Sequence, residues 1–388
     1  MVRGAPVGRR MRFTSRLQHA RVFSLNVFPN PSAHFGATLG MVDALARAGW
    51  SVTLHAHFIA DEMQARASSM GMDARIRFGW SARPHGRFQK LLTLVVWVLT
   101  LLARRDGLVL TRSPTLALLA CRAERVVLEI HQRRRSPIFG LDALWPLRFV
   151  RRRGLRVACI SANLAESVRR DFPVLPRDTV VVVPSGFWAA WFSDTRRPAP
   201  GKPRVGYAGS LYPGRGAERV IYLARAFADV EFEVVGGPTT SWESLTRSLV
   251  TPTNLHYRGP IPHEDVPHFL ASCTVLLAPY QHAVLIGNGE DTSAWASPLK
   301  IPEYLAAGRA ILASRVPMVQ QLLVDGRNAR LVDPGHAESW VLALREILSD
   351  QELCEQLGRA AHATAFPALT WDKRIDTILN SSTVGGAA

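Results

Sequence analysis

The chain has 388 residues, of which 47% are hydrophobic and 20% are charged. This usage excludes a disordered or collagen-like chain, and the length predicts two domains. The four cysteines are far apart and form no Cys-x-x-Cys pair, which excludes a disulfide scaffold and a zinc knuckle and favours a reducing compartment.

The net charge of +16 is unevenly spread, because residues 1–190 carry 29 basic and 11 acidic side chains while residues 191–388 carry 18 and 20. Such an excess favours an anionic partner for the first half, either phospholipid head groups or nucleic acid. The alternative is that the arginine content reflects a GC-rich coding sequence. No zinc finger, RRM signature or basic helix repeat is present, so we expect no nucleic acid.

The N-terminal segment is basic, but no secretory apolar core follows it, so we expect a cytoplasmic protein. The longest apolar run, residues 91–103, is too short to cross a bilayer, which needs about 20 residues. Basic residues flank it on both sides, and it predicts either a helix lying in the membrane interface or a buried core helix. A second basic cluster, residues 133–135, 148 and 151–153, surrounds the apolar stretch 138–147, which contains Trp145. Together the two segments predict a surface that binds an anionic membrane peripherally, on the inner face of the cytoplasmic membrane.

Short β-branched runs alternate with amphipathic stretches, which predicts parallel sheets in an α/β fold. A loop rich in Pro and Gly at residues 198–203 separates two such series. We therefore expect a Rossmann-like domain over residues 1–195, a second over 196–366, and a C-terminal helix and tail over 367–388. The predicted strands are 22–27, 52–56, 107–111, 126–130, 157–160 and 180–183, then 204–208, 231–235, 255–257, 275–278 and 310–313.

Ligands of such domains bind beyond the carboxyl ends of the strands. The first loop there, residues 26–36, ends at Gly36 before a predicted helix over 37–48. A glycine at this place lets backbone N–H groups approach an anion at the start of the helix. The loop lacks the full GxGxxG pattern, so the alternative is a loop that only needs a flexible residue, and a dinucleotide-dependent dehydrogenase is not expected.

The second loop, residues 206–216, reads GYAGSLYPGRG. Its glycines predict a tight turn whose N–H groups point at one place, and Arg215 adds a guanidinium, as a diphosphate requires. The alternative is a solvated arginine on a surface turn.

The third segment, residues 297–308, reads SPLKIPEYLAAG. It predicts a helix with Ser297 as N-cap, Pro298 at the first helical position and Gly308 at the end. The first turn and Lys300 could hold phosphate oxygens, and Glu303 could accept hydrogen bonds from the vicinal hydroxyls of a ribose. The alternative is that Glu303 only complements the helix dipole.

Together these motifs resemble those of the retaining glycosyltransferases of family 4, which have the GT-B fold. The second domain of that family opens with a G-R-L-x3-K-G turn, and here Gly209, Ser210, Leu211, Arg215 and Gly216 stand in those places. The similarity continues through residues 263–280, 297–314 and 324–334 to a closing helix near Trp371, and is looser in the first domain. The resemblance implies two Rossmann-like domains with parallel sheets facing across a cleft, and a C-terminal helix packing back toward the first domain.

The resemblance also implies roles for single residues. Glu303 resembles the ribose-binding glutamate of the family, Arg215 the lysine that neutralises the diphosphate, and His131 the first-domain histidine near the anomeric centre. For His131 a structural role is the alternative. Gly36 resembles the loop glycine near the donor phosphates. The predicted catalytic residues are His131, Arg215 and Lys300, and the predicted donor-binding residues are Gly36, Gly209, Ser210, Ser297, Leu299 and Glu303.

Two departures from the family pattern bear on activity. Trp295 stands where the family has a first glutamate, which contacts the donor sugar, and Ser210 stands in place of an arginine. Glu290 and Asp291 in the long loop before Trp295 are candidate substitute carboxylates, with an unliganded acidic loop tip as the alternative.

The resemblance implies a retaining transferase that moves a sugar from a nucleotide-diphosphate donor to a saccharide or lipid-linked acceptor in cell-envelope polysaccharide or glycolipid synthesis. Arg215 and Lys300 would stabilise the leaving diphosphate. No D-x-D motif follows a strand, so we expect neither a metal nor a cofactor. The alternatives are a noncatalytic sugar-nucleotide binder and a GT-B nucleotide-sugar epimerase or hydrolase.

Overall fold

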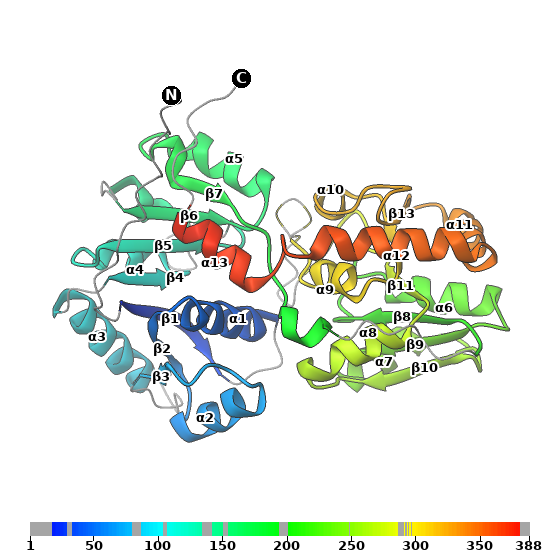
Figure 1. Cartoon of the computed structure of the whole chain (residues 1–388), viewed down its shortest axis with the longest axis horizontal. Coiled ribbons are helices and arrows are strands. Elements are labelled where there is room, and N and C mark those ends of the chain that lie inside the picture. The colour runs from blue at the N-terminus through cyan, green and yellow to red at the C-terminus, as the bar shows by residue number, and fades with distance from the viewer. Residues whose placement is uncertain are drawn as a thin grey trace, which may run out of the picture.

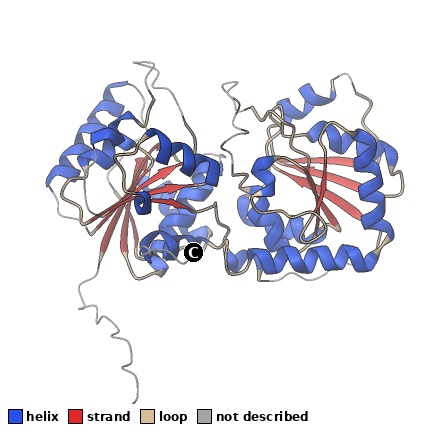
Figure 2. Ribbon diagram, turned by 90° about the horizontal axis from the view of Figure 1, so that it is seen from above, coloured by secondary structure: helices blue, strands red, loops and turns tan. Residues whose placement is uncertain are grey.

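The computed structural model describes residues 18–28, 33–79, 87–103, 107–133, 142–149, 154–193, 201–247, 249–285, 291, 293, 295 and 297–380. The named strands form two separate parallel sheets, which lie side by side in Figure 1. Helices cover both faces of each sheet (Figure 2). The predicted α/β fold of two Rossmann-like domains is therefore confirmed.

The first sheet has the strand order β3-β2-β1-β4-β5-β6-β7. The order reverses between β1 and β4, and such a reversal places a ligand-binding edge at the carboxyl ends of these strands. The strands are β1 (His19–Val27), β2 (Ser51–His57), β3 (Ile76–Phe78), β4 (Leu108–Thr111), β5 (Arg125–Ile130), β6 (Leu155–Cys159) and β7 (Val180–Val182). The helices between them are α1 (Ala33–Arg47), α2 (Ala60–Ser69), α3 (Arg87–Ala103), α4 (Pro114–Leu119) and α5 (Ala162–Asp171), with 3-10 turns η1 (Trp145–Phe149) and η2 (Arg177–Thr179).

The second sheet has the order β10-β9-β8-β11-β12-β13, with the same reversal between β8 and β11. Its strands are β8 (Arg204–Ala208), β9 (Glu231–Val235), β10 (Leu255–Gly259), β11 (Val275–Ala278), β12 (Ala310–Ser314) and β13 (Arg330–Val332). The accompanying elements are α6 (Ala217–Ala226), α7 (Thr239–Thr246), η4 (His263–Asp265), α8 (Val266–Ser272), α9 (Lys300–Ala307), α10 (Pro317–Gln320), α11 (Ala337–Ser349) and α12 (Gln351–Ala365).

Both faces of each sheet are apolar, because successive side chains of a strand point to opposite faces and helices cover both. On β5, Val127 belongs to the cluster that contains α1, and Val126 to the cluster on the other face. On β8, Tyr207 and Ala208 likewise belong to two different apolar clusters, one on each face of the second sheet. Unbroken apolar runs in the sequence are the result.

The sequence missed β3 and β13. Each has three residues and lies at an edge of its sheet. A three-residue edge strand is too short to show a periodicity that distinguishes it from a loop.

The chain crosses between the domains twice, and the crossings lie against each other. The first contains η3 (Ala189–Phe192). Phe187 N–H donates to Leu369 O, and Trp371 N–H donates to Phe187 O, each at 3.1 Å. After the second crossing, α13 (Trp371–Asn380) packs on α1 of the first domain (Figure 1). The predicted return of the C-terminal helix is confirmed.

The apolar run of residues 91–103 lies in α3 and is buried on one face only. Trp97 and Leu101 are 1% and 2% exposed, whereas Leu91 and Leu99 are each 59% exposed. The predicted burial in a core therefore holds for one face of the helix, and the opposite face is exposed. The exposed apolar face consists of Leu91, Leu92, Leu94, Val95, Leu99 and Leu102. In the described residues, no helix combines the length and the apolar character needed to cross a bilayer.

The second predicted membrane-facing cluster is only partly as expected. Arg133 does not face outward as a solvated cation, because its guanidinium donates to Asp171, Asp142 and Ser167. Trp145 is exposed, and the neighbouring Phe149 is too. Residues 134, 135 and 150–153 lie outside the described residues.

Candidate active site

The turn after β8 brings its backbone against the first residue of α9. Gly209 has φ of 147°, and a Cβ there would lie 3.2 Å from both Cε and Nζ of Lys300. A side chain at this position would be strained and would press on the lysine. Ser210 follows in the turn, and its carbonyl accepts a hydrogen bond from the Tyr207 hydroxyl at 2.7 Å.

Lys300 and Arg215 converge on one aromatic ring. The Lys300 Nζ lies 4.8 Å from the centroid of the Tyr280 ring, and Cζ of Arg215 lies 5.6 Å from the same centroid. The lysine also sits 3.9 Å from the centroid of Tyr207. The predicted pairing of the turn arginine with the helix lysine is thus present in the structure.

The Lys300 ammonium is buried and has no hydrogen-bond partner among the described residues, and the same holds for Nε of Arg215. Burial and the neighbouring Arg215 charge together hold the pKa of Lys300 well below its usual range. A basic amine and a guanidinium that lie against the same ring and have unpartnered nitrogens among the described residues are arranged to receive an anion.

The start of α9 differs from the prediction. The helix begins at Lys300 with Leu299 at the N-cap position, and no side chain caps it. Ser297 is therefore not the N-cap and Pro298 is not the first helical residue. The carbonyl of Pro298 accepts from Ile301 N–H at 3.1 Å, so a separate turn precedes the helix. Leu299 packs against the apolar cluster of the first domain.

Glu303 is paired with a histidine that the sequence did not single out. Its Oε1 lies 2.5 Å from Nε2 of His263. Burial alone would lower the pKa of His263, but the Glu303 carboxylate outweighs it and the pKa lies above its usual value. The other carboxylate oxygen of Glu303 has no hydrogen bond within the described part of the chain.

Gly36 reaches this pair from the first domain. It lies in the first turn of α1, which begins at Ala33, so the predicted placement in a loop before the helix is wrong. The helix includes Phe35 and Gly36, and the side chain of Phe35 is buried in the apolar cluster to which α1 contributes. A Cβ at Gly36 would lie 2.9 Å from Nδ1 of His263. Gly36, His263 and Glu303 therefore form one contact between the domains.

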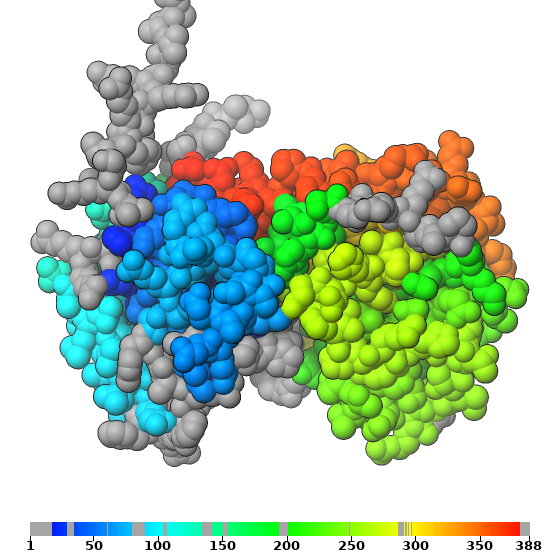
Figure 3. Space-filling view, turned by 60° about the horizontal axis from the view of Figure 1, so that its bottom comes forward, coloured from blue at the N-terminus to red at the C-terminus, as the bar shows by residue number. Residues whose placement is uncertain are grey.

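Other interdomain contacts flank this point. The rings of Trp188 and Trp191 stand edge-on to His263, at centroid distances of 5.4 and 5.3 Å. Arg66 of α2 donates to both carboxylate oxygens of Glu264 at 2.7 and 2.8 Å. Figure 3 shows α2, in blue, touching the yellow-green segment that carries Glu264 and α8.

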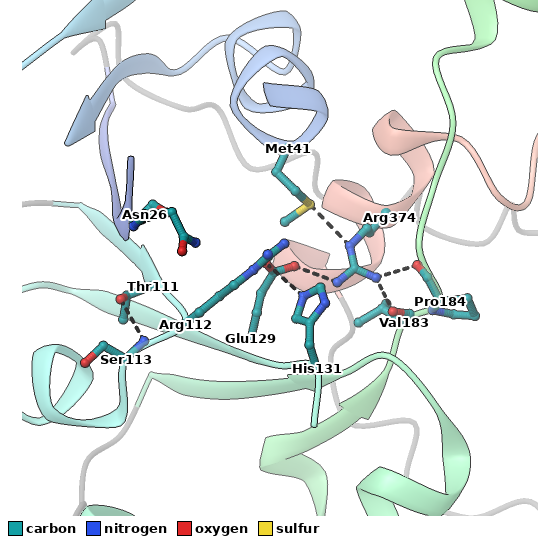
Figure 4. Close-up of polar contacts among 11 residues, drawn as sticks. Asn26, Met41, Thr111, Arg112, Ser113, Glu129, His131, Val183, Pro184 and Arg374 are labelled. Carbon is teal, nitrogen blue, oxygen red and sulfur yellow. Dashed lines mark hydrogen bonds and ion pairs between the residues drawn. The ribbon is translucent and has the colours of Figure 1, made fainter. Parts of the chain in front are cut away.

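His131 belongs to a separate cluster of charges in the first domain (Figure 4). It follows β5, and its Nε2 lies 3.5 Å from Oε2 of Glu129. Glu129 in turn pairs with Arg112 and with Arg374 of α13. Nothing in the sequence indicated that a residue of the C-terminal helix lies beside His131.

Of the two candidate substitute carboxylates in the acidic loop, the structure describes only Asp291. Glu290 lies outside the described residues. Asp291 accepts hydrogen bonds from Val284 N–H and Ser293 N–H at 2.9 Å each, and these bonds hold the pKa of its carboxyl below the usual value. Trp295 packs against an apolar cluster of the first domain, and its carbonyl accepts from Ser161 Oγ at 3.1 Å.

Three residues of the site were missed by sequence reasoning: Tyr280, His263 and Arg374. Tyr280 follows the predicted strand 275–278 by two residues, and its position just after a strand end could have marked it as a site residue.

The expectation that the protein binds no metal stays a prediction. The described residues contain no group of three or more His, Cys, Asp or Glu side chains suited to a metal ion.

Part of the chain matches a known family. Residues 192–364 match the family model described as "Glycosyl transferases group 1". The D-inositol 3-phosphate glycosyltransferase of Corynebacterium diphtheriae is 28% identical over 151 residues, which are 37% of this chain and 32% of the relative. The chain thus matches only 32% of the length of this curated relative.

Solved structures are similar over nearly the whole chain. Alr3699/HepE of Anabaena, in complex with UDP, has a TM-score of 0.66 at 14% identity and covers 94% of this chain and 98% of its own. A glycosyltransferase from Rickettsia africae has a TM-score of 0.69 at 13% identity, covering 94% and 100%. WaaG, a glycosyltransferase involved in lipopolysaccharide biosynthesis, has a TM-score of 0.67 at 14% identity, covering 93% and 100%. The chain therefore has the GT-B fold, and its residues 192–364 are similar to the glycosyl transferases of group 1.

Proposed function

We propose that the protein is a retaining glycosyltransferase of family 4 that moves a sugar from a nucleotide-diphosphate donor to a saccharide or lipid-linked acceptor. The observation that carries this proposal is the convergence of Arg215 and Lys300 on Tyr280, with a buried lysine ammonium that has no partner among the described residues. A diphosphate would supply the missing negative charge. UDP in the Anabaena structure makes uridine nucleotides the first to test.

The mechanism follows from where charge develops. When the bond between the anomeric carbon and the diphosphate breaks, negative charge grows on the leaving group. Lys300 and Arg215 stabilise this charge more strongly in the transition state than in the ground state. The acceptor hydroxyl then attacks on the face that the diphosphate leaves, and a phosphate oxygen takes its proton. This route needs no protein nucleophile, metal or cofactor.

Further residues orient the donor in this proposal. The second carboxylate oxygen of Glu303 accepts a hydrogen bond from a ribose hydroxyl, while His263 holds the first. Gly209, Ser210, Ser297 and Leu299 line the diphosphate and nucleotide. From the first domain, Gly36 approaches the donor phosphates and His131 approaches the anomeric centre of the sugar.

Thermal shifts with UDP-, GDP- and ADP-sugars test donor binding. A ligand at 100 times its Kd stabilises the folded state by about 2.7 kcal/mol, so the cognate donor should raise Tm clearly. Arg215→Met should abolish this rise. Arg330→Met is a matched control, because Arg330 lies in the same domain and pairs on the surface with Glu346. A wild-type protein that no nucleotide sugar stabilises would contradict the proposal.

Trp295 favours a second candidate, a noncatalytic sugar-nucleotide binder. The side chain at the place of the family's first glutamate is apolar and packs against the first domain. A noncatalytic protein would bind the donor and leave it intact, and an epimerase would convert it with no acceptor present. NMR of the anomeric protons during incubation, with and without a saccharide acceptor, distinguishes these outcomes from transfer.

We further propose that the acceptor is met at an anionic membrane surface on the cytoplasmic side, in envelope polysaccharide or glycolipid synthesis. The support is the exposed apolar face of α3, defined above by six aliphatic side chains. Helix α4 contacts both α3 and η1, and Trp145 and Phe149 of η1 are exposed apolar side chains as well. Apolar anchors beside a basic domain suit the interface of an anionic bilayer.

Sedimentation with phosphatidylglycerol vesicles tests this surface. The wild type should bind at low salt and release as salt rises. The double variant Leu91→Ser, Leu99→Ser should bind much less. Leu342→Ser is the control, because Leu342 is 62% exposed on α11 of the other domain. Equal binding by all three proteins, or none by the wild type, would refute the assignment.

A further inference from the structure

A buried carboxylate beside His131 is held by two arginines from distant parts of the chain. Glu129, on β5, is 3% exposed. Its Oε2 accepts from Nε of Arg112 at 3.0 Å, and its Oε1 accepts from Nη2 of Arg374 at 2.6 Å (Figure 4). Burial alone would raise the pKa of Glu129, but the two guanidinium charges outweigh it and hold the pKa well below its usual range. The carboxylate therefore stays ionised.

Arg374 is fixed in place on all sides. It is 4% exposed, donates to the carbonyls of Val183 and Pro184, and places Nε 3.2 Å from the sulfur of Met41. A rigid arginine gives the Glu129 carboxylate a fixed position. Together Arg112 and Arg374 carry one more positive charge than Glu129 neutralises.

This charge excess acts on His131. Burial is the main cause that lowers the pKa of His131, to about 4, and Arg112 is the next, while Glu129 opposes them. The charged groups that act on it among the described residues are Arg112, Arg374 and Glu129. The ring is therefore neutral near neutral pH.

The two ring nitrogens of His131 have different surroundings. Nε2 is buried and has no hydrogen bond of normal geometry within the described residues, and Glu129 Oε2 lies 3.5 Å from it. The side chain as a whole is 27% exposed. A neutral imidazole beside a carboxylate carries its proton on the nitrogen that faces the carboxylate, and its other nitrogen keeps a lone pair.

We propose that Glu129, held by Arg112 and Arg374, is a positioning residue that keeps the proton of the neutral His131 ring on Nε2, so that Nδ1 acts as a hydrogen-bond acceptor for a substrate hydroxyl. Only the identity of that hydroxyl rests on the proposed transferase function. The charge and tautomer of His131 belong to the chain itself, so they can be tested without a substrate.

Long-range ¹H–¹⁵N NMR of the full chain, labelled in histidine and assigned with His131→Gln, measures both properties. In the wild type, the His131 signals should show the Nε2–H tautomer from pH 8 down to pH 5. In Arg112→Gln the loss of one cation should raise the pKa of His131 by about one unit or more. Arg112→Lys should restore most of the wild-type behaviour, because it restores the charge.

Arg133→Gln is the matched control. It removes an arginine of the same domain that pairs with Asp142 and Asp171 and is not among the groups acting on His131, so the His131 titration should stay unchanged. A thermal melt of each variant verifies folding. A wild-type His131 that titrates near 6.5, a proton on Nδ1, or equal shifts in Arg112→Gln and Arg133→Gln would overturn the proposal.

A kinetic measurement separates this inference from the function on which it builds. With a donor that the wild type uses, Arg112→Gln should move the acid limb of the kcat profile to higher pH and leave the donor KM near its wild-type value. An unmoved acid limb would contradict the proposal. If no nucleotide sugar is turned over, the transferase function fails, while the NMR result still decides the state of His131.

Discussion

Lys300→Met should make the free protein more stable and much less active. Methionine keeps the length of the side chain and removes its amino group. The Lys300 amino group is buried without a hydrogen-bond partner among the described residues, which costs about 1–3 kcal/mol. Its contact with the Tyr207 ring at 3.9 Å returns about 1 kcal/mol. The net gain on substitution is therefore about 1 kcal/mol, or roughly 2–4 °C in Tm for a domain of this size.

Activity should change in the opposite direction. If Lys300 stabilises the leaving diphosphate, its loss should lower kcat/KM by about 10² to 10³. Scanning calorimetry of the free protein and a product assay with the cognate donor measure the two effects. Lys373→Met is the control, because Lys373 forms an exposed ion pair with Asp376 on α13, and both quantities should stay near wild type.

The prediction requires two opposite changes in one variant: higher stability of the free protein and lower activity. A K300M protein that is less stable than the wild type would mean that the ammonium already has a compensating partner in the free protein. A stabilised variant with wild-type turnover would mean that the buried charge does not serve the leaving group. Either result would refute the reasoning.

Three further predictions concern the same region. Binding of the donor should be accompanied by uptake of a proton on Lys300, because the pKa of Lys300 is lowered in the free protein. The affinity for the donor should therefore fall as pH rises through this lowered pKa. Titration calorimetry in two buffers of different ionisation enthalpy should give different binding heats. Gly209→Ala should weaken UDP binding at least about tenfold, whereas Gly326→Ala, at φ of 70° with nothing within 4 Å of its Cβ, should only lower stability; equal UDP affinities in the two variants would contradict this. Because the pKa of His263 is raised by Glu303, the stability it contributes is present below pH 6.5 and is lost as pH rises through the raised value; urea unfolding at pH 6 and pH 9 should show this loss in the wild type and not in Glu303→Gln.

Local sequence patterns predicted the parts of the fold that depend on neighbours in the chain. The strand 204–208 and the glycine turn after it form as expected, because Val205 favours the extended backbone of a strand and Gly209 tolerates the positive φ of the turn. The end of α9 is also as expected, since Gly308 adopts φ of 64°. Its start was misplaced because Ser297 and Pro298 fit a helix start equally well as the turn that precedes one.

Contacts between distant segments could not be predicted in the same way. Arg374 lies 245 positions after Glu129 in the chain, and their pairing exists only because α13 crosses back to the first domain. No local pattern marks an arginine on an amphipathic helix as one that will be buried. The pairing of His263 with Glu303 depends similarly on how α8, which directly follows η4, packs on α9.

Helix α13, from the C-terminal end of the described chain, completes the core of the first domain. Trp371, Ile375 and Ile378 of α13 are at most 3% exposed within its core, and Arg374 neutralises its buried Glu129. During synthesis, residues 1–195 therefore emerge from the ribosome without part of their own core, and the second domain has time to fold first. A fragment ending near residue 195 should expose apolar surface and aggregate, and supplying residues 366–380 as a separate peptide should rescue it.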